Sequence, residues 1–160
     1  MKPEIRDLPE QEILYVRRTG LINNDFTQAA QEAFAVLWQF MEDHDLCNQC
    51  SQCLAITPDE AGITPPEDCR YDAGVILRPG VQVKPEGEVG LQALEAGRWA
   101  VFQHKGPYGT LWQTWNAAYR DWLPASGEEL RDAPPYEVYL DDAEHTDPGD
   151  LRTEIYIPIK

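Results

Sequence analysis

A glutamate lies inside the apolar segment "LRTEIYIPIK" (151–160) that ends the chain. Ile155, Ile157 and Ile159 are typical of a buried strand, yet Glu154 lies among them. A carboxylate on such a strand is costly to remove from water unless another group compensates it. The position of Glu154 therefore predicts a site at which the carboxylate binds a cation or activates a water molecule. The alternative is a solvent-exposed strand end at which Glu154 pairs with an arginine.

Cysteines form a second group with chemical potential, in "CNQCSQC" (47–53) and "DCRYDAG" (68–74). The C-x2-C-x2-C spacing of Cys47, Cys50 and Cys53, with Cys69 as a fourth thiolate, is compatible with a metal site. Three close thiols without a histidine partner are not a standard zinc pattern, however. Thiols in a polar connecting segment can also be idle or oxidise to a disulfide. We expect no metal, and these four cysteines are the only candidate ligands.

Other catalytic signatures are missing from the sequence. Ser51 and Ser126 lie in predicted loops without a G-x-S-x-G elbow. The chain has neither a Walker-type phosphate loop nor a dinucleotide fingerprint. We therefore expect no cofactor.

The elements that position these residues follow from hydrophobic periodicity. Strands are predicted at 12–20, 52–60, 68–80, 94–109, 136–142 and 152–159. One helix is predicted at 23–45, with Asn24 or Asp25 as its N-cap, and a second at 110–127, ended by Pro124 and Gly127. In the second helix, the spacing of Trp115, Tyr119 and Trp122 favours a stripe that faces the core.

Both halves of the chain run strand, helix, strand, strand, and "YVRRTGLINNDF" parallels "FQHKGPYGTLWQ". We therefore predict an α+β fold with one domain, 1–160, built from two βαββ pseudo-repeats at about 1–80 and 90–160. Fused edge to edge, the two units would form a curved antiparallel sheet with helices on one face. The other face would form a central groove, where small molecules tend to bind.

Four segments in register resemble one known family. They are "CRYDAGV" (69–75), "AGRWAVFQHKGPYGTLWQTW" (96–115), "WLPASGEELRDAPPYEVYL" (122–140) and "TEIYIPI" (153–159). They resemble the GyrI-like small-molecule-binding domain, also known as the effector-binding domain of AraC- and MerR-type multidrug regulators. The resemblance covers nearly the whole chain and implies the same fold of two βαββ units. Two departures are the cysteine segment, which has no family role, and the absence of a DNA-binding segment before the first strand.

The resemblance also implies a site. The family binds lipophilic, often cationic, aromatic compounds against aromatic side chains and a buried glutamate, and Glu154 falls on that position. Residues two apart share a face of a strand, so Tyr156 is expected to face the groove with Glu154. The expected ligand-binding residues are Glu154, Tyr156, Tyr71, Tyr108, Trp112, Tyr139 and His104.

Each expected wall residue has a structural alternative. Tyr71 and Tyr108 fit a packed core or rim equally well, and Tyr139 is included because it shares a face with Glu137. His104 could shuttle a proton near neutral pH, whereas a histidine at a strand end is more often structural.

The formal net charge is −15, from 28 acidic and 13 basic residues. This balance argues against direct nucleic-acid binding and favours a cationic ligand or a basic partner, although acidic surfaces also simply keep proteins soluble. No apolar run approaches the roughly 20 residues that span a bilayer, and the polar N-terminus "MKPEIRDLPEQ" indicates a cytoplasmic protein.

Three functions follow from these features. The first is a binder of lipophilic, cationic small molecules. The second is a hydrolase of strained cyclopropane-type electrophiles, as in some stand-alone relatives, with Glu154 and Tyr108 as the catalytic residues. The third is a protein-interaction role in the manner of a gyrase inhibitor, with DNA gyrase or another protein as the partner.

Overall fold

The computed structural model describes residues 1–21, 25–59 and 63–160, and the chain forms two compact units. Unit 1 comprises Met1–Pro9 and Glu95–Lys160, and unit 2 comprises Glu10–Leu94. The chain therefore begins in unit 1, leaves it after Pro9 and returns to it at Glu95.

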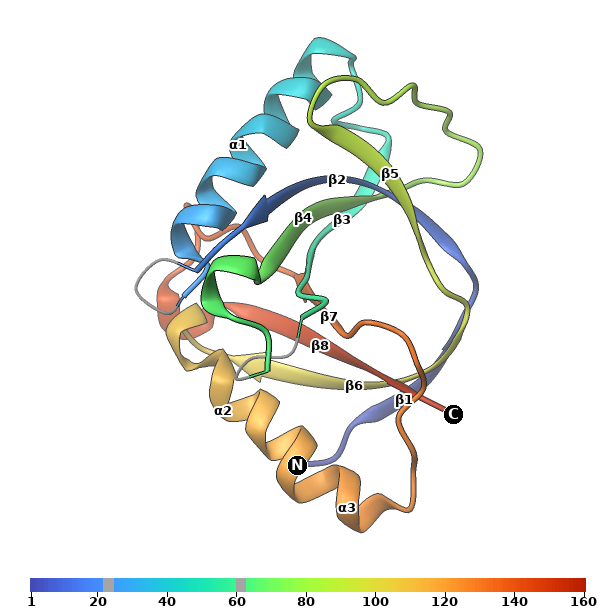
Figure 1. The fold of residues 1–160 in the computed structure, drawn as a ribbon, viewed down its shortest axis with the longest axis vertical. Helices are drawn as coiled ribbons and strands as arrows, with labels where there is room; N and C mark the ends of the chain where they lie inside the picture. The colour runs from blue at the N-terminus through green and yellow to red at the C-terminus, as the bar shows by residue number, and fades with distance from the viewer. Residues whose placement is uncertain (22–24, 60–62) are drawn as a thin grey trace. The chain divides into compact units, whose positions relative to one another are not determined.

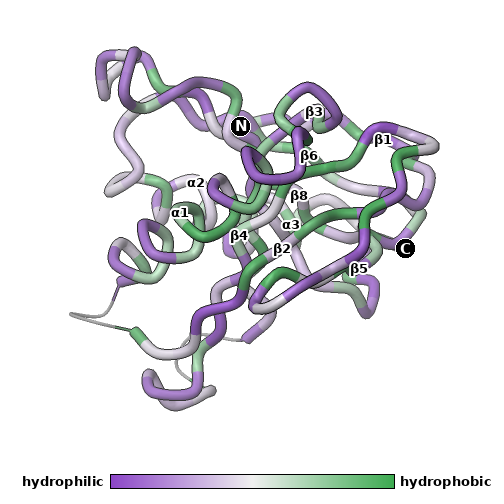
Figure 2. Tube along the Cα trace, turned by 90° about the horizontal axis from the view of Figure 1, so that it is seen from above, coloured by the Kyte–Doolittle hydropathy of each residue, from purple (hydrophilic) through white to green (hydrophobic). Residues whose placement is uncertain are grey.

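Unit 2 is an antiparallel sheet with one long helix against it. Its strands are β2 (Gln11–Thr19), β3 (Cys50–Ile56), β4 (Arg70–Leu77) and β5 (Val89–Leu94), in the spatial order β3-β4-β2-β5. Helix α1 (Thr27–Asp43) lies along β2 and β4 (Figure 1) and buries Ala33, Leu37 and Met41. Figure 2 shows β2 passing from hydrophobic to hydrophilic residues toward its end. A short 3₁₀ turn, η1 (Pro66–Asp68), precedes β4.

Helix α1 begins at Thr27, whereas the sequence predicted a helix from residue 23. Asn24, one of the two expected N-caps, lies outside the described residues. Asp25 accepts a hydrogen bond from the Thr27 N–H through Oδ1 at 3.0 Å, so its side chain does satisfy a backbone donor at the helix start.

Unit 1 has the same kind of sheet. Its strands are β1 (Glu4–Leu8), β6 (Gly97–Lys105), β7 (Tyr136–Tyr139) and β8 (Arg152–Ile159), in the spatial order β1-β6-β8-β7. Its helical segments are η2 (Tyr108–Thr110), α2 (Leu111–Asn116), the π-helical η3 (Ala117–Trp122) and α3 (Leu123–Ser126), with a further turn at η4 (Pro148–Asp150). The predicted core stripe is confirmed, because Trp115, Tyr119 and Trp122 pack against a cluster that contains Phe102 and Ile155.

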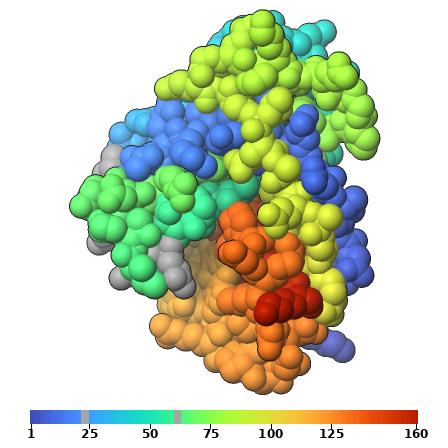
Figure 3. All heavy atoms as spheres, turned by 45° about the vertical axis from the view of Figure 1, so that its right-hand side comes forward, coloured from blue at the N-terminus to red at the C-terminus, as the bar shows by residue number. Residues whose placement is uncertain are grey.

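The second helix continues past Pro124, which was expected to help end it. Pro124 lies in α3, directly after the π-helical η3, and the helix extends only two residues beyond it. The helix ends at Ser126, before Gly127. After it, the chain returns to β8. In Figure 3 the dark red C-terminal residues lie against orange residues that follow α3, and the Lys160 N–H donates to the Glu129 carbonyl at 2.9 Å.

Two sets of hydrogen bonds recur in the two units. The Gly20 N–H donates to the Cys69 carbonyl, and the Gly106 N–H donates to the Leu151 carbonyl, both at 2.8 Å. Arg70 binds Asp59 through its backbone N–H and its guanidinium, and Arg152 binds Asp141 in the same way. By these contacts β4 of unit 2 is equivalent to β8 of unit 1, with Arg70 at the position of Arg152.

The α+β class with antiparallel strands is confirmed. Strands β1 and β5 were not predicted, and the expected end of a strand at residue 60 lies outside the described residues. No helix in the described part of the chain is long and apolar enough to cross a membrane.

Candidate functional site

The register of β7 and β8 divides the side chains of unit 1 between two faces of its sheet. Opposite residues of an antiparallel pair project to the same face. Glu137 lies opposite Ile155 and Tyr139 opposite Thr153, whereas Tyr136 lies opposite Tyr156. Ile155 packs with the helical segment, so Glu137 and Tyr139 are on the helix-facing side. Glu154 and Tyr156 are on the other side.

The predicted site residues of unit 1 are therefore not all brought together. Tyr139 and His104, which lies opposite Thr153, share the helix-facing side, and Glu154 and Tyr156 share the opposite side. The expectation that Glu154 and Tyr156 lie on the side away from the helix agrees with this register, but the other unit 1 candidates are not there with them.

The helix-facing side carries the carboxylate of Glu137, which was not among the predicted site residues. Glu137 Oε1 accepts a hydrogen bond from Trp115 Nε1 at 2.8 Å, and its Oε2 accepts one from the Tyr139 hydroxyl at 3.0 Å. No basic side chain in the described part of the chain forms an ion pair with Glu137. Both partners are neutral, so the negative charge is not compensated.

Burial raises the pKa of Glu137 above the usual carboxyl range, and the two hydrogen bonds oppose this rise only in part. Glu137 is nevertheless not fully enclosed, because it keeps some exposed surface. The carboxylate is therefore poorly solvated, although the residue as a whole is not fully buried.

Aromatic rings surround this carboxylate. The Trp115 ring is stacked on Tyr119, with centroids 6.0 Å apart, and the Tyr139 ring lies against Tyr108 at 5.4 Å. Tyr108 is 40% exposed, so part of its ring is available to a ligand. A poorly solvated carboxylate beside aromatic rings is suited to binding a lipophilic cation.

His104 supports the start of the helix on this face. It is buried, with Nδ1 2.7 Å from Thr114 Oγ1 and Nε2 2.9 Å from Thr110 Oγ1. Because the Thr110 hydroxyl donates to the Pro107 carbonyl, its oxygen accepts from His104 Nε2–H, and Nδ1 then accepts from Thr114. Both ring nitrogens are thus used within the fold, which matches the structural alternative. A proton-shuttle role stays a prediction.

On the opposite face, Glu154 is compensated by an arginine. Arg6 Nη2 lies 2.9 Å from Glu154 Oε2, and Arg6 Nη1 donates to the Tyr156 hydroxyl at 2.7 Å. The Tyr156 hydroxyl in turn donates to Glu154 Oε1 at 3.0 Å. The Glu154 side chain is only 13% exposed, so the pair is not at a wet strand end. The ligand-binding role of Glu154 stays a prediction.

Tyr156 is a packed residue in this structure. Its ring is stacked on Tyr136 at 4.5 Å and lies edge-on to Trp99 at 6.4 Å. Burial raises the pKa of Tyr156 to about 12, and the nearby Glu154 charge adds to the rise. The Arg131 guanidinium covers the Trp99 ring at 4.8 Å. The rings of Tyr156 and Trp99 therefore pack against other side chains of the same unit.

The remaining predicted residues lie elsewhere. Trp112, on α2, is 59% exposed. Tyr71, on β4 of unit 2, is buried, and its ring lies 5.3 Å from that of Phe26.

The four cysteines are all free thiols. In the described part of the chain, the three-residue group with metal-ligand geometry is Asp142, Glu144 and His145, and it includes no cysteine.

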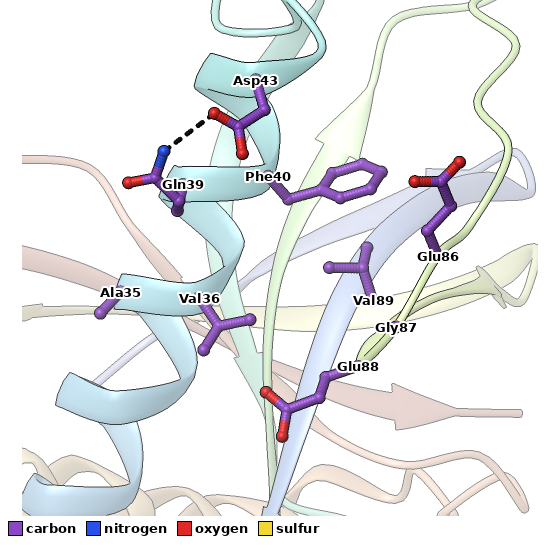
Figure 4. Close-up of a pocket in the computed structure, with 9 residues that line it drawn as sticks. All are labelled: Ala35, Val36, Gln39, Phe40, Asp43, Glu86, Gly87, Glu88 and Val89. Carbon is purple, nitrogen blue, oxygen red and sulfur yellow. Dashed lines mark hydrogen bonds between the residues drawn. The ribbon is translucent and has the colours of Figure 1, made fainter.

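A surface hollow in unit 2 offers a different kind of binding surface (Figure 4). It measures about 470 Å³ and lies between α1 and the turn before β5, with Val36, Phe40 and Val89 as its apolar lining. Its carboxylates are exposed to solvent: Asp43 accepts a hydrogen bond from Gln39, Glu88 pairs with Arg18, and the Glu86 side chain is 59% exposed. Water solvates these carboxylates, whereas the Glu137 carboxylate is poorly solvated, and we therefore favour Glu137.

The repeated Asp–Arg contacts also identify the position in unit 2 that is equivalent to Glu137 in unit 1. If Arg152 corresponds to Arg70, then Ile155 corresponds to Ala73, and the residue opposite Ala73 on β3 is Ala55. Unit 2 therefore has an alanine where unit 1 has Glu137. The carboxylate is a feature of one unit only.

The chain matches the family described as the GyrI-like small molecule binding domain over residues 1–160. It is 32% identical over 127 residues to the Escherichia coli K12 protein named "Probable transcriptional regulator YgiV", covering 78% of this chain and 76% of that one. It is also 28% identical over 162 residues to a protein of Serratia proteamaculans named DNA gyrase inhibitor, covering 100% of this chain and 99% of that one.

Three solved structures share the fold at low sequence identity. EcmrR in its DNA complex has a TM-score of 0.80 at 19% identity, and the alignment covers 99% of this chain but only 57% of EcmrR. A hydrolase from Listeria innocua has a TM-score of 0.66 at 15% identity, covering 99% and 92%. SAV2435 bound to tetraphenylphosphonium has a TM-score of 0.64 at 17% identity, covering 100% and 94%.

Proposed function

We propose that this chain, which belongs to the GyrI-like small-molecule-binding domain family, binds lipophilic cations with Glu137 as their counter-charge. The observation that carries the proposal is the Glu137 carboxylate, which two neutral donors hold and no basic side chain of the described residues compensates. A cationic ligand would supply the missing positive charge. The surrounding rings of Trp115, Tyr139 and Tyr108 would each add about 0.5–2 kcal/mol of cation–π attraction.

The fold neighbour SAV2435 supports this ligand class, because it was solved with tetraphenylphosphonium, a lipophilic aromatic cation. For Glu154 and Tyr156 we propose a supporting role instead of the predicted ligand contact. Arg6 already neutralises Glu154, so a second cation there would meet a compensated pair.

The test compares two ions of the same shape and opposite charge. Titration of the protein with tetraphenylphosphonium, followed by tryptophan fluorescence, is expected to give saturable binding. The tetraphenylborate anion, at the same concentrations, is expected to give none, because no positive charge among the described residues beside Glu137 would compensate a buried anion. Equal binding of the two ions would show that hydrophobicity alone attracts them and would refute the role of the carboxylate.

A matched variant sharpens the test. Glu137→Gln keeps the shape and the acceptor for Trp115 Nε1 but removes the charge. We expect tetraphenylphosphonium affinity to fall about 30-fold, which corresponds to about 2 kcal/mol for a lost charge contact in a desolvated site. Tetraphenylborate binding is expected to stay weak or to improve.

A second candidate function is hydrolysis of a neutral, strained electrophile. One observation favours it: Glu137 has a raised pKa and shares a hydrogen bond with the Tyr139 hydroxyl. The carboxylate would take a proton from water as the water oxygen attacks a cyclopropane carbon. The strained C–C bond would break and leave its electron pair on the carbonyl as an enolate. A hydroxyl of Tyr139 or Tyr108 would stabilise the enolate oxygen, and the proton held by Glu137 would return to the enolate carbon. Mass spectrometry of a cyclopropyl ketone incubated with wild type and with Glu137→Gln tests this, since only the wild type would form a hydrated product.

A protein partner is supported by a different observation, the full-length similarity to the Serratia protein named DNA gyrase inhibitor. The net charge of −15 is suited to a basic partner surface. A gyrase supercoiling assay at low and high salt tests this role. Absence of inhibition at low salt, where the charges act most strongly, would count against it.

A further inference from the structure

Glu137 has one hydrogen-bond partner that can only donate and one that can donate or accept, and this difference determines where the carboxyl group can hold a proton. The indole N–H of Trp115 can only donate, so Oε1 must remain an acceptor whatever the charge of the carboxyl group. The Tyr139 hydroxyl can donate or accept, and its distance of 3.0 Å from Oε2 suits either direction. A proton on Oε2 can therefore be donated to Tyr139, and both hydrogen bonds survive.

The surroundings favour such a proton while no ligand is bound. The side chains that pack on this side of the sheet are apolar or aromatic. They are Trp115 from α2, Tyr119 from η3, Tyr108 from η2 and Ile155 from β8. No charged group among the described residues contributes to the electrostatics of Glu137. Burial without a counter-charge disfavours the ionised carboxyl.

His104, on β6, is another side chain on this side of the sheet that can bind a proton. It lies opposite Thr153 and is held between Thr110 and Thr114. Any proton released from this region could therefore come from Glu137 or from His104, and the experiment must separate them.

We propose that ligand-free Glu137 carries a proton on Oε2 and that a cationic ligand binds by exchanging with it, so that one proton leaves for each cation bound. This inference rests on the proposed function. In the exchange, the neutral carboxyl group loses its proton to solvent, the carboxylate pairs with the cation, and the Tyr139 hydroxyl turns to donate to Oε2. No net charge is buried at any stage, which is why the exchange avoids the cost of an isolated buried ion.

Isothermal titration calorimetry with tetraphenylphosphonium tests this exchange. The same titration is made from pH 5 to pH 8 in buffers of different ionisation enthalpy, and the heat difference gives the number of protons released. We expect close to one proton per cation at low pH, falling toward zero at high pH. The affinity is expected to rise about tenfold per pH unit where Glu137 is protonated and then to level off.

The outcomes distinguish the two proposals. No tetraphenylphosphonium binding at any pH would overturn the proposed function itself. Binding with a pH-independent affinity and no proton release would overturn only the exchange. Glu154→Gln should release the same number of protons as the wild type, because Arg6 already compensates that carboxylate.

Two further measurements assign the proton. The infrared C=O stretch of a protonated carboxylic acid should disappear when tetraphenylphosphonium is added to the wild type, and Glu137→Gln should show no such loss. Tyr139→Phe removes a donor that stabilises the carboxylate, so the midpoint of the affinity profile should move to higher pH. Proton release that persists unchanged in Glu137→Gln would assign the proton to another group, such as His104, and refute the exchange.

Discussion

The ion pair between Arg6 and Glu154 offers a quantitative test of how unit 1 is held together. Arg6→Met keeps most of the aliphatic length of the side chain and removes the guanidinium. Glu154 would then keep only the hydrogen bond from the Tyr156 hydroxyl, and its 13% exposed side chain would lose its counter-charge. We expect this variant to be clearly less stable than the wild type.

The expected loss in the free energy of unfolding follows from the exposure of Arg6 and Glu154. Exposed ion pairs contribute about 0–1 kcal/mol, and removing one partner of a buried pair costs about 3–5 kcal/mol. The Arg6 side chain is 29% exposed and Glu154 is 13% exposed, so this pair lies between the two cases. We expect Arg6→Met to lower the free energy of unfolding by about 2 kcal/mol. For a chain of this size, that lowers the melting temperature by about 4–8 °C.

A double-mutant cycle by urea denaturation isolates the interaction. Glu154→Gln alone is expected to cost about 1 kcal/mol, because Arg6 keeps its contacts to Glu4 and Tyr156. The double variant should be about as stable as Arg6→Met alone, which gives a coupling of about 1 kcal/mol. Additive effects would refute the pairing and would leave the Glu154 charge available for a ligand.

Three further results are expected. The folded state holds a proton on Glu137 at pH values where the unfolded chain has lost it, so stability should fall as pH rises from 4.5 toward the raised pKa; urea denaturation at several pH values should show a flatter profile for Glu137→Gln. Asp59→Asn and Asp141→Asn should lower the melting temperature by similar amounts, because each removes the charge and one acceptor oxygen from the same set of three hydrogen bonds, and a large difference by calorimetry would contradict their equivalence. Trp112→Ala should change stability by less than about 0.5 kcal/mol, since Trp112 is 59% exposed; a loss of tetraphenylphosphonium affinity in this variant would establish it as a ligand contact.

The strands and helices that could be predicted are those with strong apolar periodicity. Residues 12–20 and 152–159 alternate clearly, and each forms a strand close to its predicted bounds. Strand β1 (Glu4–Leu8) was missed because "EIRDL" is mostly polar and exposed, and its order comes from pairing with β6. Strand β5 (Val89–Leu94) similarly depends on its pairing with β2.

The site was harder to predict than the fold, because two glutamates fit the same local pattern. Glu137 in "YEVYL" and Glu154 in "TEIYIPI" both interrupt an apolar strand, and each has a tyrosine two residues later on the same face. What separates them is tertiary. Arg6, 148 residues from Glu154 in the sequence, neutralises one carboxylate, and the neutral Trp115 indole meets the other. The interruption of "YEVYL" was a visible signal, but the partner of each glutamate was not.

We propose Glu137, and not Glu154, as the counter-charge for a cationic ligand. The most direct test is the tetraphenylphosphonium affinity of wild type, Glu137→Gln and Glu154→Gln, measured side by side by calorimetry at pH 8. We expect about a 30-fold loss for Glu137→Gln and an affinity within threefold of wild type for Glu154→Gln. The reverse pattern, with affinity lost in Glu154→Gln and kept in Glu137→Gln, would contradict the claim and place the ligand on the opposite face of the sheet.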